Sequence, residues 1–255
     1  NTGTLINMSD ADWVSGYASG NALDFDGSND YVNVPDSDSV SVGNGDFTIS
    51  FWVYPHSVSI THVPISKIHD TSEKEYMIAI ESQKIGIDIE RSGNNGVART
   101  YDIMSANEWQ HIRVTYDVSA EDVDIYLDGV SKSLSVDTIG GASNTQTDAL
   151  NIGRRGGSYQ NAYFNGLIDD VKIYDALIPL ATSPTPAVGA TGVTATTDLS
   201  WTAGSGATSH DVYFGVDSTP DSTEFKGNQS GTTYDTGTMD GSTTYYWRID
   251  EVNSQ

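Results

Sequence analysis

Two segments of the chain place carboxylates where a β-strand ordinarily carries Val or Thr. The segment ALDFDGSNDYVNV holds Asp26, Asn29 and Asp30 within one turn, and the segment YFNGLIDDVKIYDAL holds Asp169 next to Asp170. Carboxylate, amide and main-chain carbonyl oxygens are the ligands that Ca²⁺ prefers in proteins. These segments therefore favour a structural calcium site, and the alternative is that the acids are solvated residues of turns and strand edges.

The second segment also contains a change in the alternation of apolar residues. Ile168 has one parity, whereas Val171 and Ile173 have the other. An extra residue in the strand, a β-bulge, accounts for such a change and would turn one of the two intervening acids inward. The pattern therefore predicts a bulge at Asp169 and Asp170.

Paired carboxylates that act as general acid and base form a second kind of chemistry. The sequence has no Glu-x-Asp-x-Glu run, and its period-two acidic pairs are Glu73 with Glu75, Asp88 with Glu90, and Asp122 with Asp124. The last two pairs alternate with Ile and Val, which indicates the outer face of a strand. The five histidines form no HExxH motif, and the absence of cysteine excludes a thiolate nucleophile. We therefore expect a protein that is not an enzyme.

The segment RRGGSYQNAYF is the best candidate for ligand contact. Sugars are recognised by stacking on aromatic rings together with planar hydrogen-bonding groups, and this segment has both kinds. The alternative is a hairpin loop whose arginines offset an acidic surface. Trp52 and Trp109 are expected in the hydrophobic core. The candidate glycan-binding residues are Arg154, Arg155, Tyr159, Asn161 and Tyr163.

Charge and composition limit the partners of the chain and its location. Its 35 acidic and 12 basic residues give a net charge of −23, which repels nucleic acid and anionic lipid. No run approaches the length of about 18 apolar residues that a transmembrane helix needs, and no signal peptide is present. We expect an extracellular or cell-surface protein. Its two sequons, at Asn7 and Asn228, are candidate N-glycosylation sites.

Alternation of apolar and polar residues, interrupted by turn signals, dominates the sequence. Many short strands of this kind predict an antiparallel sandwich or barrel, and no segment predicts a stable helix. Asp128 and Gly129 predict a hairpin, because both central residues of a type I′ turn need positive φ. The predicted apolar faces are Phe47, Ile49, Phe51 and Val53; Ile85, Ile87 and Ile89; Ile112, Val114 and Tyr116; and Val123, Ile125 and Leu127.

Composition changes at PLATSPTPAVGATGVTATTD, which begins with three closely spaced prolines and continues with small residues. Such a segment is typical of a linker followed by a new domain. The sequence therefore predicts one domain at residues 1–180 and a small immunoglobulin-like sandwich at 181–255. Both are acidic, with 26 acids and 10 bases in the first and 9 acids and 2 bases in the second.

An ordered set of motifs resembles a known family. GNALDFDGSNDYVNVPDS, DFTISFWVYP, EWQHIRVTYD, IYLDGV, LNIGR and YFNGLIDDVKIYDALI follow one another over residues 4–178. Together they resemble the laminin G-like, concanavalin A-type jelly rolls of bacterial secreted proteins. In that family the early strand and the last strand are neighbours, so the resemblance places Asp26 near Asp170. Together with the oxygen-rich turns DGSND and GNGDF, this placement leads us to expect one structural Ca²⁺ bound by Asp26, Asn29, Asp46 and Asp170.

Residues 184–255 resemble a fibronectin type III domain. The spacing Met239-x-x-x-Thr243-x-Tyr245 fits the tyrosine corner of that family, in which the Tyr hydroxyl bonds back to the main chain. Trp201 stands where the family keeps a core tryptophan on its second strand.

Both resemblances leave one strand unaccounted for. The chain begins at the turn NTGTLINMSD, where the first family would already have formed a strand, and its end at EVNSQ precedes the last strand of the second family. Incomplete edges favour strand addition. We therefore expect a structural or adhesive protein that assembles head-to-tail with copies of itself into a fibre or matrix. The alternative is a carbohydrate-binding module of a secreted or cell-surface polysaccharide-active protein.

Overall fold

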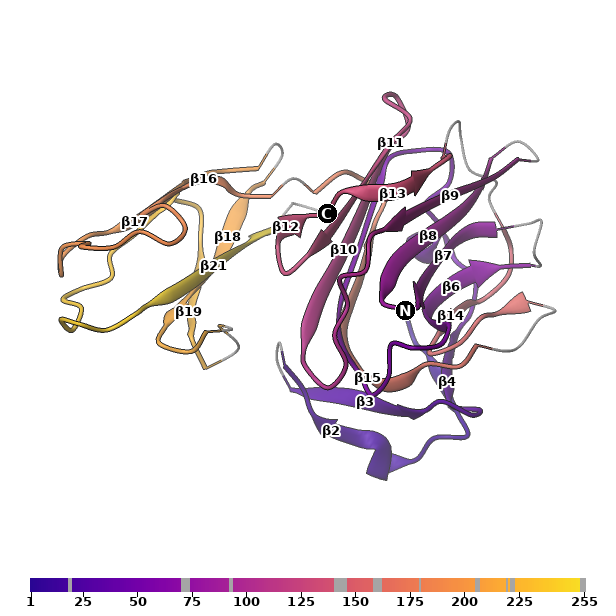
Figure 1. The fold of residues 1–255 in the computed structure, drawn as a ribbon. Coiled ribbons are helices and arrows are strands. Elements are labelled where there is room, and N and C mark those ends of the chain that lie inside the picture. Colours follow the sequence, from indigo (N-terminus) through magenta and orange to yellow (C-terminus); the bar gives the residue numbers. More distant parts are fainter. Residues whose placement is uncertain are drawn as a thin grey trace. The chain divides into compact units, whose positions relative to one another are not determined.

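The computed structural model describes residues 1–17, 20–69, 74–91, 94–139, 146–157, 162–178, 180–204, 207–218, 220 and 223–252. It divides into two compact units, Asn1–Leu177 and Ile178–Gln255. The described residues form strands, turns and two short 3₁₀ helices, η1 (Asp10–Asp12) and η2 (Asp38–Val40) (Figure 1). The all-β prediction is confirmed. In this described part, no helix has the length and apolar character needed to cross a membrane.

The first unit contains two antiparallel sheets that pack face to face (Figure 1). The eight-stranded sheet has the order β1 (Thr4–Ile6), β4 (Tyr31–Val34), β14 (Leu150–Ile152), β6 (His62–Ile68), β7 (Lys74–Glu81), β8 (Lys84–Arg91), β9 (Asn94–Thr100), β13 (Leu134–Asp137). The seven-stranded sheet has the order β12 (Val130–Ser131), β11 (Asp122–Leu127), β10 (Gln110–Asp117), β5 (Phe47–Pro55), β15 (Asn165–Tyr174), β3 (Asn21–Asp26), β2 (Trp13–Ser15).

The core of the first unit lies between the two sheets. Every residue of the four predicted apolar faces is buried there, which confirms the alternation inferred from the sequence. The predicted hairpin is also present, because Asp128 and Gly129 have φ of 53° and 74° and Leu127 pairs with Val130. One expectation was wrong: the segment interpreted as an opening turn contains β1, which pairs with β4 at the edge of the eight-stranded sheet.

The predicted bulge lies in β15. Asp169 pairs with Trp52 and Lys172 pairs with Ser50, so two residues of β15 face a single residue of β5. Asp170 takes the left-handed backbone conformation, with φ of 50°. Val171 and Ile173 thereby return to the core. Neither acid enters the core, because Asp169 lies in the row of Trp52 on the opposite face and Asp170 pairs with Lys172 at 2.8 Å.

The second unit contains two three-stranded sheets. One has the order β16 (Thr182–Thr185), β17 (Leu199–Thr202), β20 (Thr233–Tyr234), and the other has the order β19 (Phe225–Gln229), β18 (Ser209–Gly215), β21 (Tyr246–Val252). Its buried core consists of Leu199, Trp201, Val212, Phe214 and Ile249. The hydroxyl of Tyr245 accepts a hydrogen bond of 3.0 Å from the main-chain N–H of Asp240. Kinship of this unit with fibronectin type III domains stays a prediction.

Candidate functional site

The outer face of the seven-stranded sheet carries a row of side chains that the strand register fixes. His111 on β10 pairs with Trp52 on β5, and Trp52 pairs with Asp169 on β15. In the next row, Arg113 pairs with Ser50. These residues alternate with Phe51, Val53 and Ile112, which point into the core. The row therefore lies on the face of the sheet that the core does not use.

Five aromatic side chains gather on this surface, which we name the aromatic face: Tyr17, Trp52, Tyr54, Trp109 and His111. Ring centroids are 4.0 Å apart for Tyr17 and Trp52, and 4.9 Å apart for Trp52 and His111. Trp109 lies 5.7 Å from Tyr17 and 5.7 Å from Tyr54. Separations of this size are typical of attractive aromatic contacts.

Trp52 is buried, as predicted, whereas Trp109 is only partly buried and packs against it. Trp52 is only 6% exposed, but it packs with Tyr17 and Trp109 in a cluster separate from the main core. Its parity in DFTISFWVYP, opposite to Phe51 and Val53, was the signal in the sequence. The contribution of Tyr17 had no such signal, because this residue precedes β3 and its position depends on Asp169. The Asp169 carboxylate accepts a 2.9 Å hydrogen bond from the Tyr17 main-chain N–H.

Polar and partly exposed groups border the aromatic face. Tyr54, Trp109 and His111 are half-buried, and the exposed ring of His56 lies 5.9 Å from Tyr54 in an edge-to-face arrangement. His56 Nδ1 is 3.0 Å from the side-chain oxygen of Asn165. Half-buried rings beside amide and imidazole groups can stack on a sugar and hydrogen-bond its hydroxyls.

The predicted glycan-binding loop contributes little exposed surface in its described part. Arg154 is buried, its guanidinium carbon lies 3.5 Å from the centroid of the Tyr31 ring, and its Nε donates to Asn151 at 3.0 Å. Tyr163 is half-buried, and its carbonyl lies 3.1 Å from His62 Nδ1. Arg155 is also half-buried. Tyr159 and Asn161 lie outside the described residues, so this loop stays a predicted ligand site.

One glycine explains part of the conformation of that loop. Gly153 has φ of 90°, and a Cβ at this position would lie 2.4 Å from two ring carbons of Phe25. Its N–H donates to the carbonyl of Pro64, and its own carbonyl accepts from Phe164. The glycine that opens GRRGG therefore serves close packing against the core.

The four predicted calcium ligands do not converge. Strands β3 and β15 are neighbours, as expected, but Asp26 pairs with Asn165 and not with Asp170. Asp46 lies at the opposite end of β5 from the level of Asp26, and its carboxylate accepts a 2.9 Å hydrogen bond from the N–H of Val118. No group of three His, Asp or Glu side chains suited to a metal occurs in the described ranges. The predicted ligand set therefore does not fit one Ca²⁺ ion.

The carboxylates of Asp26 and Asp30 accept hydrogen bonds within the turn DGSND itself. The Asp26 carboxylate accepts hydrogen bonds from the N–H groups of Ser28 at 2.7 Å and Asn29 at 3.2 Å. Burial acts to raise the pKa of Asp26, but these main-chain hydrogen bonds outweigh it, so the pKa is lowered. Asp30 accepts from the N–H of Asp26, and burial raises its pKa. Turn formation accounts for both residues.

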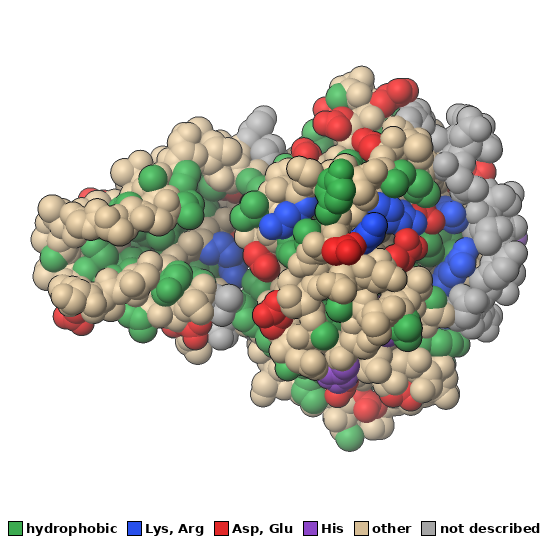
Figure 2. Space-filling model, viewed as in Figure 1, with side chains coloured by type: hydrophobic (Ala, Val, Ile, Leu, Met, Phe, Trp, Pro, Cys, Tyr) green, Lys and Arg blue, Asp and Glu red, His purple; other side chains and the backbone are tan. Residues whose placement is uncertain are grey.

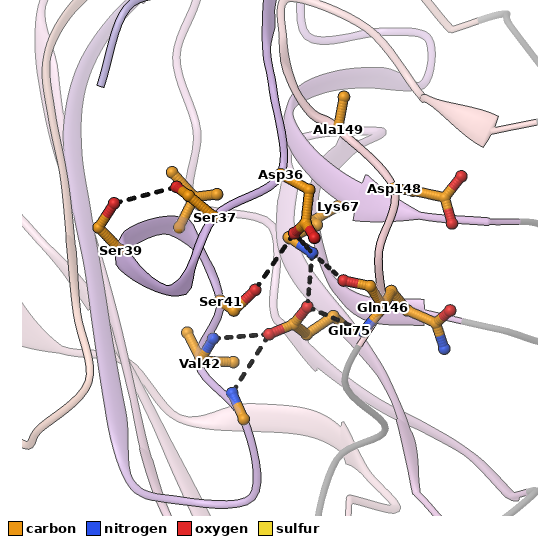
Figure 3. Close-up of polar contacts among 12 residues, drawn as sticks. Asp36, Ser37, Ser39, Ser41, Val42, Lys67, Glu75, Gln146, Asp148 and Ala149 are labelled. Carbon is orange, nitrogen blue, oxygen red and sulfur yellow. Dashed lines mark hydrogen bonds and ion pairs between the residues drawn. The ribbon is translucent and has the colours of Figure 1, made fainter.

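A buried ion cluster ties three segments of the first unit together (Figure 3). Glu75 accepts hydrogen bonds from the N–H groups of Val42 at 2.6 Å and Gln146 at 3.2 Å. Lys67 lies 2.9 Å from Glu75 and 2.8 Å from Asp36, and it also donates to the Gln146 carbonyl. Each of the three ammonium hydrogens has an acceptor, so the cluster is equipped to stabilise loops and leaves no donor for a ligand.

The acidic pair Asp88 and Glu90 is on the predicted face, opposite Ile87 and Ile89, but both acids are buried. Asp88 pairs with Lys74 at 3.1 Å and with Arg99, and Glu90 accepts from the N–H of Lys74 at 3.2 Å. Burial acts to lower the pKa of Arg99, but the charges of Asp88 and Glu81 raise it overall. Asp88 is therefore committed to ion pairs, and Glu90 accepts a main-chain hydrogen bond. Glu73, the partner of Glu75 in its pair, is outside the described residues, and Asp122 and Asp124 are exposed.

Both sequons are on the surface. Asn7 is exposed and donates to the carbonyl of Asn29 at 2.9 Å. Asn228 is exposed and donates to Asp211 at 2.8 Å. Their modification stays a prediction.

A family model described as the concanavalin A-like lectin/glucanases superfamily matches residues 26–180. The chain belongs to this superfamily. The match covers most of the first unit, in agreement with the resemblance seen in the sequence. No curated protein sequence matches the chain significantly.

Solved structures of this superfamily fold are similar to the chain at low sequence identity. The receptor-binding domain of botulinum neurotoxin C/D mosaic serotype aligns with a TM-score of 0.51 and 14% identity over 68% of this chain and 43% of that chain. The ligand-binding domain of botulinum neurotoxin serotype D, in complex with N-acetylneuraminic acid, aligns with a TM-score of 0.50 and 13% identity over 68% of this chain and 43% of that chain. Domains LG4-5 of the mouse laminin alpha1 chain align with a TM-score of 0.45 and 14% identity over 60% of this chain and 40% of that chain. The chain therefore spans less than half the length of these structures.

Proposed function

We propose that the first unit of this superfamily member binds carbohydrate without catalysing its conversion, and that the aromatic face is the binding surface. The observation that carries the proposal is the gathering of Tyr17, Trp52, Tyr54, Trp109 and His111 on a sheet face outside the core. Tyr17 and Trp52 are buried beneath this face, whereas the half-buried rings of Tyr54, Trp109 and His111 are the ones that can stack on a sugar.

The superfamily favours this function over the fibre or matrix subunit preferred from the sequence. Its description names lectins and glucanases, both of which bind carbohydrate. An extracellular or cell-surface location fits a glycan binder. Self-association through strand donation has no comparable support in the family.

The arrangement of the carboxylates supports a binding role without catalysis. A glycosidase needs two carboxyl groups, roughly 5–9.5 Å apart, that face a sugar across its glycosidic bond. On the aromatic face, Asp169 is occupied by the N–H of Tyr17. Elsewhere, Asp88 and Glu75 are neutralised by Lys74, Arg99 and Lys67.

The excess of acidic residues in the first domain, 26 against 10 basic ones over residues 1–180, indicates which glycans it prefers. Polysaccharides that carry uronate or sulfate groups would be repelled by the acidic surface, and neutral chains would not. We therefore propose neutral polysaccharides as the ligands.

Affinity electrophoresis through gels that contain neutral polysaccharides tests the proposal. We expect retardation of the 255-residue protein in at least one gel and its loss in the variants Tyr54→Ala and Trp109→Ala. Tyr101→Ala is the matched control, because this tyrosine is 60% exposed and lies outside the aromatic face. Equal retardation of all three variants, or no retardation in any gel, would contradict the proposal.

A further inference from the structure

Arg154 is a buried cation whose partners differ from those of the buried lysines. The chain has 35 acidic and 12 basic residues, so carboxylates are plentiful. Lys67 and Lys74 are buried and each pairs with a carboxylate, and Figure 2 shows basic side chains of the first unit next to acidic ones. Arg154 is only 6% exposed, yet it forms no ion pair within the described residues.

The guanidinium group of Arg154 keeps two of its nitrogens for a ligand. Its Nε donates to the side-chain oxygen of Asn151 at 3.0 Å, and its central carbon lies 3.5 Å from the centroid of the Tyr31 ring. Neither Nη1 nor Nη2 has a hydrogen-bond partner in the described part of the chain, and solvent reaches both. A largely buried guanidinium without a counter-charge is unfavourable, and an anion bound at these nitrogens would supply that charge.

The guanidinium group lies on the outer face of the eight-stranded sheet. Val32 and Val34 of β4 point into the core, so Tyr31 and Asn33 of the same strand point outward. Because Arg154 stacks on the Tyr31 ring, it shares this outer face. The aromatic face belongs to the other sheet, so the two surfaces are separate.

Buried polar groups hold Arg154 in position. The hydroxyl of Ser66, which is fully buried, donates to the Arg154 carbonyl at 2.9 Å and accepts from the N–H of Gly156 at 2.9 Å. The buried amide of Asn151 donates to the carbonyl of Ala149 at 3.0 Å, which turns its oxygen toward Arg154. The guanidinium is therefore fixed before a ligand binds, so little conformational entropy is lost on binding.

We propose that Arg154 binds the carboxylate of an acidic sugar. The N–H groups of Nη1 and Nη2 form a planar fork that matches the two oxygens of a carboxylate. Asn33 and Thr4 are paired in one row of the sheet, and their amide and hydroxyl groups suit the hydroxyls of the same sugar. The acidic surface repels a chain with many anionic groups, so the ligand carries a single carboxylate. This site is independent of the binding of neutral polysaccharides by the aromatic face.

Calorimetric titration of the 255-residue protein with the methyl glycosides of glucuronic acid and galacturonic acid tests the site. Three matched probes accompany them: methyl glucoside, which lacks the carboxylate, N-acetylglycine, which lacks the sugar ring, and inorganic phosphate. We expect at least one of the two uronides to bind about tenfold or more tighter than each matched probe, because only the uronides offer a carboxylate and sugar hydroxyls together.

Two variants and one control locate the binding. Arg154→Lys keeps the positive charge but removes the planar fork, so we expect uronide binding to weaken about tenfold or more. Asn33→Asp preserves the size of the side chain and adds a negative charge next to the site, so it should weaken binding to a similar extent. Lys172→Met changes the net charge by the same amount on the other sheet, and we expect it to leave uronide binding unchanged.

Three results would overturn the proposal. The first is uronide binding that is absent or no tighter than the binding of any matched probe. The second is unchanged uronide binding in folded Arg154→Lys or, should that variant fail to fold, in Asn33→Asp. The third is loss of retardation of Arg154→Lys in the gels of neutral polysaccharide, because the site would then not be separate from the aromatic face.

Discussion

The Lys67 ammonium lies 2.9 Å from the Glu75 carboxylate, and neither side chain is exposed to solvent. The two residues come from β6 and β7, and through Asp36, Val42 and Gln146 they hold segments that are distant in the sequence. Burying two charges is unfavourable unless every donor and acceptor is satisfied, and here each has its partners. This pair therefore stabilises the first unit only as a complete cluster.

Removing one charge of this cluster should destabilise the first unit strongly. For Glu75→Gln we expect a loss of about 3–5 kcal/mol, because the Lys67 ammonium stays buried without its main counter-charge. Calorimetric unfolding of the first unit measures the loss. Lys172→Met is the control, since Lys172 pairs with Asp170 at the surface and its removal should cost less than about 1 kcal/mol. Similar losses in the two variants would contradict the role of burial.

Asp128 gives the stability of the first unit a defined pH dependence. Burial raises its pKa above 3.8, although the N–H of His111 donates to its carboxylate. An acid whose pKa is raised in the folded state lowers stability as the pH rises from below 3.8 through that folded-state pKa. Asp128→Asn removes this pH-dependent loss of stability, and asparagine suits the positive φ of 53° at this position.

We therefore expect Asp128→Asn to raise the melting temperature at pH 7 and to match the unmodified protein at low pH. The gain should be small, below about 0.5 kcal/mol, because solvent screens this partly exposed group. Melting curves from pH 3 to pH 8 measure it. A gain that is the same at every pH would show that the carboxyl ionisation is not its cause.

Calcium should not stabilise the first unit through the ligands predicted from the sequence. A ligand that binds only the folded state raises the melting temperature with its concentration. Since Asp26, Asp46 and Asp170 bind main-chain N–H groups or Lys172 at separate places, we expect equal melting temperatures with calcium and with chelator. A rise in melting temperature with calcium that Asp26→Asn abolishes would contradict this expectation and support the calcium site.

The hydroxyl of Tyr245 should stabilise the second unit. Tyr245→Phe removes the hydrogen bond to the N–H of Asp240 and leaves the ring stacked on Phe214. We expect a loss of about 1 kcal/mol, the usual net contribution of such a bond. Chemical denaturation followed by tryptophan fluorescence measures it. An unchanged denaturation midpoint would show that the Tyr245 hydroxyl does not stabilise the second unit.

The fold of the first unit was predictable because its strands follow a period of two. Parity alone assigned Phe47, Ile49, Phe51 and Val53 to the core and located the bulge after Ile168. The aromatic face was missed because a tryptophan in a strand was assigned by its type and not by its parity. The partners of Lys67 could not be predicted, because Asp36 and Gln146 approach it only through the tertiary fold.

The bulge in β15 adds one residue to the strand without changing which of its side chains pack against the core. Without Asp170, Ile168, Val171 and Ile173 would follow regular alternation and keep their inward positions. The gain or loss of a single codon here would therefore alter the course of the strand next to Trp52 without any repacking of the interior. Homologues can thus diverge in the shape of this surface through one insertion or deletion, while selection on the hydrophobic residues stays unchanged.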